Sequence, residues 1–247
     1  GLFANSRRQD FSGIEEWDVS SVTNMKSMFD NAMFFNHDIS NWDVSNVTNM
    51  AGMFSDADDF NQPLEKWDVS RVENMNCMFY GTKNFNQPLE KWDVSKVKTM
   101  DLIFACTHKF NQPLEKWDVS SVKTMLGMFA YASKFNQPLR KWDVSSVENM
   151  TWMFACAFEF NQPLASWDVS NVKDMSYMFL AHNFDFEWNF DNKSNGTHIF
   201  NIYINAQEQF QSFFNQNLNK WDVSNVEKME RMFDGSAQNP LPRWYKG

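Results

Sequence analysis

Residues 114–138 read Leu-Glu-Lys-Trp-Asp-Val-Ser-Ser-Val-Lys-Thr-Met-Leu-Gly-Met-Phe-Ala-Tyr-Ala-Ser-Lys-Phe-Asn-Gln-Pro, which is one complete copy of a repeat. The tetrapeptide Trp-Asp-Val-Ser within it occurs seven times at a spacing of 25 residues, beginning at Trp17, Trp42, Trp67, Trp92, Trp117, Trp142 and Trp167. An eighth copy begins at Trp221, 54 residues after Trp167. A fixed period of 20–50 residues is typical of solenoids, in which each repeat forms one turn and neighbouring turns share a core.

The spacing of apolar residues predicts the elements of each turn. Within residues 125–132, Met, Met, Phe and Ala fall at i, i+3, i+4 and i+7, which predicts a short helix. Pro138 cannot lie inside a helix, so the preceding Phe-Asn-Gln predicts a turn that returns the chain. The next residues, from Leu139 through Trp142 to Val144, have the spacing of a short parallel strand.

These features together predict an α/β fold, a leucine-rich-repeat-like solenoid of about nine 25-residue turns. Each turn would contain a strand and a short helix, and the strands would form a parallel sheet on one face. We expect one solenoid domain over residues 1–247, with regular repeats over about 11–182 and final repeats over 213–247. Residues 183–212 are irregular and form either a β-hairpin insertion or a degenerate turn.

Composition excludes several classes of protein. The chain has 22 Lys and Arg against 31 Asp and Glu, a net charge of -9, and 43% hydrophobic residues. This apolar content argues against disorder, and the lack of clustered basic residues argues against nucleic acid as a partner. No apolar run reaches the roughly 18 residues of a membrane span. Residues 1–8 contain no apolar signal region, so the compartment is left unknown.

No pattern predicts catalysis. The four histidines, at His37, His108, His182 and His198, lack metal-ligand spacing, and neither a Ser-His-Asp pattern nor a phosphate loop occurs. We therefore expect no enzyme activity, no catalytic residues, no metal and no cofactor. The repeated Met residues share the apolar face with Phe and are expected to fill the core.

Two polar columns need partners. The Asp of each Trp-Asp-Val-Ser would form a ladder of like charges, which we expect to be compensated by the Lys two residues earlier or by nearby backbone N–H groups and Ser hydroxyls. The Asn of each Phe-Asn-Gln is expected to bond the backbone of adjacent loops. Cys106 and Cys156 lie two turns apart, too far for a disulfide.

Binding is expected where the repeat is broken or varied. Phe184, Phe186, Trp188 and Phe190 alternate with polar residues, and after a turn-rich stretch Phe200 begins a second alternation. That pattern is typical of a β-hairpin, which would present its aromatic residues to a partner.

A second candidate surface is the outward side of the expected helices. Leu102, Trp152 and Tyr177 share one repeat position there. If exposed, they would form a docking surface, and the alternative is that neighbouring loops cover them. The face carrying Lys, Asp and Ser is monotonous, and it would suit a polysaccharide or a mineral surface.

The repeat resembles that of BspA-like leucine-rich-repeat surface proteins, a family found in bacteria and mycoplasmas and in proteins of microalgae and large viruses. The resemblance covers about residues 11–244; residues 35–45, Phe-Asn-His-Asp-Ile-Ser-Asn-Trp-Asp-Val-Ser, are nearest to the bacterial form. It implies a leucine-rich-repeat-like fold, adhesion or protein binding, and no catalytic residues.

We therefore expect a non-enzymatic scaffold that binds one or more protein partners within a larger assembly. The alternative is a cell-surface adhesin that binds host or matrix proteins or polysaccharide.

Overall fold

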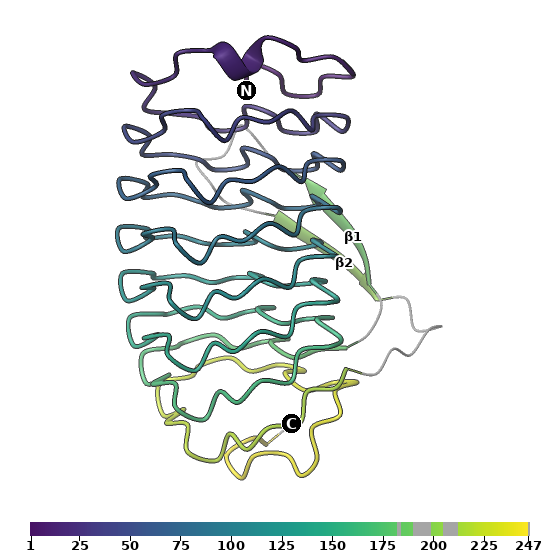
Figure 1. Cartoon of the computed structure of the whole chain (residues 1–247). Coiled ribbons are helices and arrows are strands. Elements are labelled where there is room, and N and C mark those ends of the chain that lie inside the picture. The colour runs from purple at the N-terminus through teal and green to yellow at the C-terminus, as the bar shows by residue number, and fades with distance from the viewer. Residues whose placement is uncertain (182–183, 190–198, 205–211, 247) are drawn as a thin grey trace.

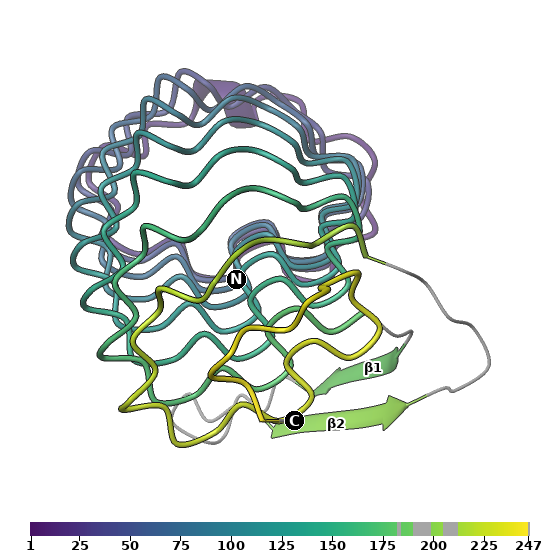
Figure 2. The same cartoon turned by 90° about the horizontal axis from the view of Figure 1, so that it is seen from below.

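The computed structural model describes residues 1–181, 184–189, 199–204 and 212–246. The chain winds through a stack of similar coils, with the N-terminus at one end and the C-terminus at the other (Figure 1). Viewed along the stack, successive coils lie over one another as a closed outline (Figure 2). Each 25-residue repeat forms one coil, so the repetitive architecture expected from the sequence is confirmed.

Regular secondary structure is almost absent, which corrects the expected α/β class. In the described part of the chain it consists of the short 3-10 helix η1 (Ile14–Glu16) and the strands β1 (Phe184–Asn189) and β2 (Ile199–Ile204). Neighbouring coils meet in single parallel bridges, such as Thr124 with Asn149, and not in a continuous parallel sheet. The helix expected over residues 125–132 does not form.

Two left-handed residues prevent that helix. Gly127 and Tyr131 both have φ of 56°, a conformation that a right-handed helix excludes. Met128 N–H donates to Met125 O at 3.2 Å, and Ala132 N–H donates to Phe129 O at 3.0 Å. The segment is therefore two successive four-residue turns, each with positive φ at its third residue, as in a type II turn.

The remaining backbone N–H groups of this segment tie one coil to the next. Gly127 N–H donates to Thr151 O at 2.8 Å, and Tyr131 N–H donates to Ala155 O at 2.8 Å. The same bonds recur in the other coils, for example from Gly52 to Asn76. Alternate residues thus close turns within a coil or bond the next coil, which satisfies the backbone without a helix or a sheet.

Stacked aromatic rings fill the interior. Phe129 lies 5.7 Å from Phe104 in the preceding coil and 5.6 Å from Phe154 in the following coil, measured between ring centroids. It also stacks on Phe135 of its own coil at 4.0 Å. The Met columns are buried in the same core, as expected, and Met125 has no exposed surface. Burial of so many large apolar side chains is the main stabilising contribution to the stack.

Candidate functional site

The eighth repeat lies directly on the seventh, although 54 residues separate their tryptophans. Trp221 Nε1 donates to Leu164 O at 3.0 Å, as Trp167 Nε1 donates to Leu139 O at 3.0 Å one coil earlier. The interval exceeds one period by 29 residues, which is the length of residues 183–211. We call residues 183–211 the insertion. It lies within one coil and does not replace a coil.

The coil closes normally around the insertion. Phe214 stacks on Phe179 at 3.8 Å, as Phe160 stacks on Phe154 at 4.0 Å in the preceding coil. Ser212 forms a parallel bridge with Ser236 of the next coil, so Ser212 belongs to the stack. The irregular segment expected to end at residue 212 therefore ends one residue earlier.

Within the insertion, β1 and β2 pair in antiparallel register. Phe184 is opposite Ile204, and Trp188 is opposite Phe200. Viewed along the stack, the pair lies outside the outline of the coils (Figure 2), and in Figure 1 it is drawn at the height of earlier coils. Of the predicted binding residues, Phe184, Phe186 and Trp188 lie in β1 and Phe200 lies in β2, whereas Phe190 falls outside the described residues.

The second group of predicted binding residues occupies a left-handed position in each coil. We call this position the variable column, because its residue type changes from coil to coil. Its members have φ between 49° and 61° and are Ser27, Gly52, Cys77, Leu102, Gly127, Trp152, Tyr177 and Arg231.

The apolar members of the variable column do not form an exposed surface, which corrects the docking expectation. Leu102 is 1% exposed and Trp152 is 9% exposed. The Trp152 ring stacks on Tyr177 at 4.5 Å, and both pack with Ala155, Cys156 and Leu180 in a small cluster outside the main core. Tyr177 is partly exposed, and its hydroxyl donates to Glu230 Oε2 at 3.4 Å. These side chains therefore cover one another.

The thiols near this column are not activated. Burial raises the pKa of Cys77 and raises that of Cys106 to about 12, so both remain protonated at neutral pH. Cys77, Cys106 and Cys156 form no disulfide. Within the described ranges, no three His, Cys, Asp or Glu residues are arranged to hold a metal ion.

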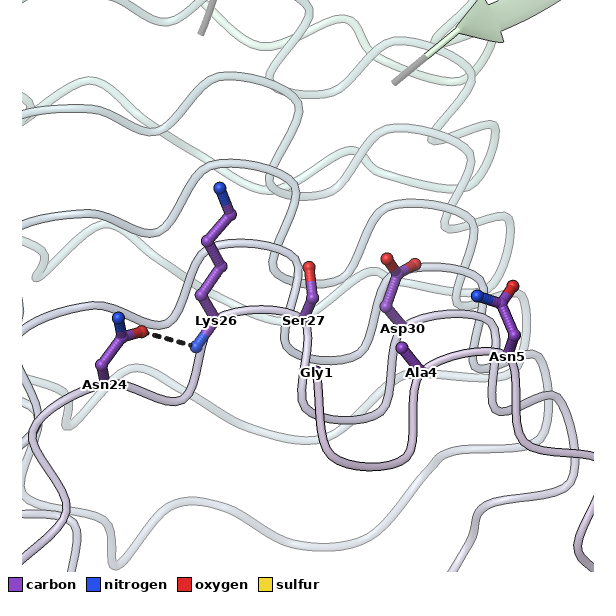
Figure 3. Close-up of a pocket in the computed structure, with 7 residues that line it drawn as sticks. All are labelled: Gly1, Ala4, Asn5, Asn24, Lys26, Ser27 and Asp30. Atoms are coloured by element: carbon purple, nitrogen blue, oxygen red, sulfur yellow. Dashed lines mark hydrogen bonds between the residues drawn. The ribbon is translucent and has the colours of Figure 1, made fainter. Parts of the chain in front are cut away.

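Two half-buried carboxylates, those of Asp30 and Asp56, interact beside a cavity near the start of the chain. Burial, together with the carboxylates of Asp30 and Asp58, raises the pKa of Asp56 to about 6. Burial also raises the pKa of Asp30, which lines a cavity of about 500 Å³ with Asn5, Lys26, Ser27 and others (Figure 3). Asn24 Oδ1 accepts a hydrogen bond from Lys26 N–H at 2.9 Å on the same rim. The lining of this cavity is polar and open to solvent, and it includes no His, Cys or aromatic side chain.

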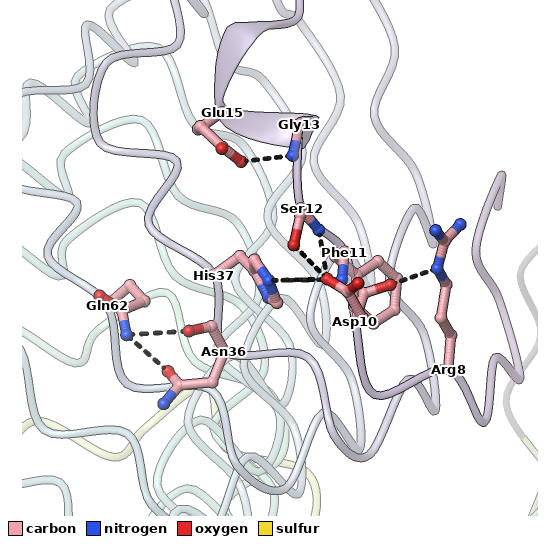
Figure 4. A network of polar contacts seen from close by, with 9 residues as sticks. All are labelled: Arg8, Asp10, Phe11, Ser12, Gly13, Glu15, Asn36, His37 and Gln62. Carbon is pink, nitrogen blue, oxygen red and sulfur yellow. Dashed lines mark hydrogen bonds and ion pairs between the residues drawn. The ribbon is translucent and has the colours of Figure 1, made fainter.

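A Ser, an Asp and a His lie together near the start of the chain (Figure 4). Ser12 donates its hydroxyl to Asp10, and His37 Nε2 lies 3.9 Å from Asp10 Oδ1. His37 Nε2 also accepts a hydrogen bond from Phe11 N–H at 3.3 Å. Because the hydroxyl bonds the carboxylate and not the imidazole, nothing activates Ser12 as a nucleophile. The group instead links adjacent coils.

The repeated Asn and Asp side chains find local partners, as expected. Asn136 Oδ1 accepts Asn161 N–H at 3.0 Å and Gln162 Nε2 at 3.0 Å. Asp143 Oδ1 accepts the hydroxyl and the N–H of Ser145, and these bonds lower its pKa.

Among the described residues, no Lys that precedes a repeat Trp forms an ion pair with the Asp column, so compensation by Lys is corrected and the alternative, compensation by Ser and backbone N–H groups, is confirmed. Lys116 Nζ instead lies 3.1 Å from Glu90 Oε2 of the preceding coil. The pattern stops after Lys141: Arg140, Ala165 and Ser166 differ from it, and the sequence reasoning assigned them no role.

The family comparison follows the repeat along the chain. The family model described as "Mycoplasma protein of unknown function, DUF285" matches residues 1–116, 103–213 and 186–244. The chain belongs to the DUF285 family. Searches of curated proteins and of solved structures found no match. The matches to DUF285 include the insertion and assign the chain no activity.

Among the described residues of this DUF285 chain, no helix is long and apolar enough to cross a bilayer.

Proposed function

We propose that this DUF285 chain is a non-enzymatic scaffold that binds a protein partner through its insertion, as one subunit of a larger assembly. The observation that carries the proposal is that the coil closes across the insertion. Phe179 and Phe214, which lie on either side of the insertion, stack on each other as Phe154 and Phe160 do in the uninterrupted coil before it. Residues 183–211 are therefore not required to complete the core.

The rest of the stack offers few alternatives for a partner. The repeated Phe, Met and Trp residues are buried, and the repeated Asn and Asp residues are engaged by neighbouring backbone groups. In a repeat protein, residues that neither fill the core nor bond neighbouring coils can vary and so can recognise a partner. The paired strands β1 and β2 lie outside the coils and carry the aromatic residues Phe184, Phe186, Trp188 and Phe200.

A deletion of residues 183–211 tests the proposal, because it joins residue 182 to Ser212 and restores a 25-residue coil. We expect this variant to keep the thermal stability of the intact chain and to lose its partner. Tagged chains would be purified from the native source and analysed by size exclusion with light scattering and by cross-linking mass spectrometry. A matched control would lack residues 93–117, one regular coil, and should retain the partner.

Two results would contradict the proposal. In the first, the folded deletion variant still forms a stoichiometric complex. In the second, the intact chain is a monomer in native extracts and forms no cross-links from its insertion.

A surface adhesin is the alternative function, supported by the resemblance of the repeats to leucine-rich-repeat surface proteins. An adhesin would be a monomer that binds intact host cells, matrix proteins or polysaccharide. Binding of such ligands by the deletion variant lacking residues 183–211 would favour adhesion through the regular faces of the coils.

A further inference from the structure

The two residues before Trp form a ladder of ion pairs from the coil of Trp67 to the coil of Trp142. Each Lys bonds the Glu of the preceding coil, and the contacts are Lys91 with Glu65 at 3.2 Å, Lys116 with Glu90 at 3.1 Å and Lys141 with Glu115 at 3.4 Å. We call this column the Glu–Lys ladder. In these three contacts each Lys has a carboxylate partner. Lys66 precedes the ladder, because Ser40 occupies the Glu position of the coil before it.

The ladder is interrupted in the next two coils. Arg140 occupies a Glu position, and Ser166 occupies the Lys position that would pair with it. Ala165 occupies the following Glu position, which leaves Lys220 without its ladder partner. Among the residues that the structure describes, neither Arg140 nor Lys220 forms an ion pair. Two uncompensated cations therefore flank the small residues of the coil between them.

A cavity lies at this interruption. It has a volume of about 190 Å³ and is lined by Arg140, Pro163, Ala165, Ser166 and Lys220. Arg140 and Lys220 come from the coils on either side of Ala165, each about 4.8 Å away at the spacing of paired backbones. Their long side chains can therefore reach the same space from opposite sides.

The backbone of the middle coil adds donors. Trp167 N–H closes a turn onto Leu164 O at 3.0 Å. In the described part of the chain, the intervening N–H groups of Ala165 and Ser166 make no backbone hydrogen bond. The Ser166 hydroxyl donates to Arg140 O at 3.1 Å, which connects the two coils at the floor of the cavity.

We propose that this cavity binds a doubly charged oxyanion, a phosphate or sulfate group. The guanidinium of Arg140 presents paired donors that match such an oxyanion, and the ammonium of Lys220 adds a point charge. The turn amides of Ala165 and Ser166 supply further donors, as in other anion-binding concavities. Because Arg140 and Lys220 are exposed, solvent screens the site, and we expect millimolar affinity at physiological salt.

The test is a titration of the intact chain with inorganic phosphate and, separately, with inorganic sulfate at constant ionic strength. We expect saturable shifts of the Ala165 and Ser166 amide signals in nuclear magnetic resonance spectra. A response to both ions supports the shared oxyanion chemistry, and a response to one alone supports the site and identifies its ligand. Matching shifts with acetate at the same concentration would overturn the assignment to a doubly charged ligand.

The repeat provides matched variants. R140E/A165E/S166K restores the Glu–Lys ladder, should fold like the neighbouring coils, and should weaken binding by about tenfold or more. The reciprocal variant E90R/E115A/K116S transfers the interruption two coils earlier and should create a second site beside Lys141. Unchanged phosphate affinity in the restored variant would refute the proposal, as would the absence of saturable shifts in the unmodified chain.

Discussion

Among single residues, Asp56 combines an unfavourable backbone conformation with an unfavourable charge. Its φ is 52°, and its carboxylate is half-buried beside Asp30 and Asp58. Burial and these two charges raise its pKa from 3.8 to about 6. The native state therefore binds this proton more tightly than the unfolded chain does. The stabilisation is fully present below about pH 4 and is lost as the pH rises through 6.

We predict that Asp56→Asn stabilises the protein at neutral pH. Asn tolerates the left-handed conformation and carries no charge, so the gain in unfolding free energy should grow from pH 4 to pH 7, reaching about 1–2 kcal/mol. Urea unfolding at several pH values measures it. The exposed Asp59→Asn serves as control. A gain for Asp56→Asn that does not change with pH would show that its charge is not the cause.

Gly127 illustrates how neighbours in the variable column constrain one another. A Cβ at Gly127 would lie 2.5 Å from Leu102 Cδ2, and φ there is 56°. We predict that Gly127→Ala lowers the unfolding free energy by about 1–2 kcal/mol. In a double-mutant cycle, Leu102→Ala should remove the steric part and leave the backbone part, with a coupling of about 0.5–1 kcal/mol. Purely additive effects would contradict this contact.

At the scale of the repeated element, the Asn of each Phe-Asn-Gln accepts hydrogen bonds from the next coil. Asn136→Ala would leave Asn161 N–H and the Gln162 amide without their shared acceptor. We predict a loss of about 2 kcal/mol in unfolding free energy. Asn136→Asp retains the accepting oxygen and should lose less than half as much. Thermal and urea unfolding compare the two, and equal losses would show that the accepting oxygen is not what matters.

Within each repeat, the sequence predicted a helix that does not form. The period and the buried columns follow from residue spacing, because packing between copies repeats with the chain. The turn expected over residues 135–138 lies earlier, at residues 132–135, where Phe135 N–H donates to Ala132 O at 3.0 Å. The first and last residues of two four-residue turns fall at i, i+3, i+4 and i+7, so they imitate one face of a helix. The distinguishing signal was at the third turn residue, where Gly52, Gly127, Gly81 and Gly235 tolerate positive φ.

The candidate sites were harder to predict for a different reason. Whether Leu102 and Trp152 are exposed depends on which side chains lie beside them in adjacent coils, and residue type alone does not fix that. The cations Arg140 and Lys220 carry a weak signal, the interruption of Glu-Lys before Trp. This interruption indicates unpaired cations only once the Lys–Glu ion pairs between neighbouring coils are known.

For the whole molecule, each regular coil should behave as a removable unit. Deleting residues 93–117 joins Trp92 to Asp118 and keeps every column in register. Because stability in such stacks depends on contacts between neighbours, we predict that the variant folds and that its urea m-value falls by about one tenth. Deleting 20 residues, 93–112, shifts the columns and should abolish cooperative unfolding. Cooperative unfolding of both variants would contradict dependence on register.

The hydrogen bonds from one coil to the next, such as Gly127 to Thr151, also have a mechanical consequence. Tension applied through the two ends of the chain loads these bonds, so the stack should peel open coil by coil from its ends. Each regular coil would release about 80–90 Å of contour length. The coil interrupted after residue 182 holds 54 residues and would release about 180 Å. Stretched in an optical trap, the molecule should therefore lengthen in steps of about 80–90 Å, with one longer step of about 180 Å.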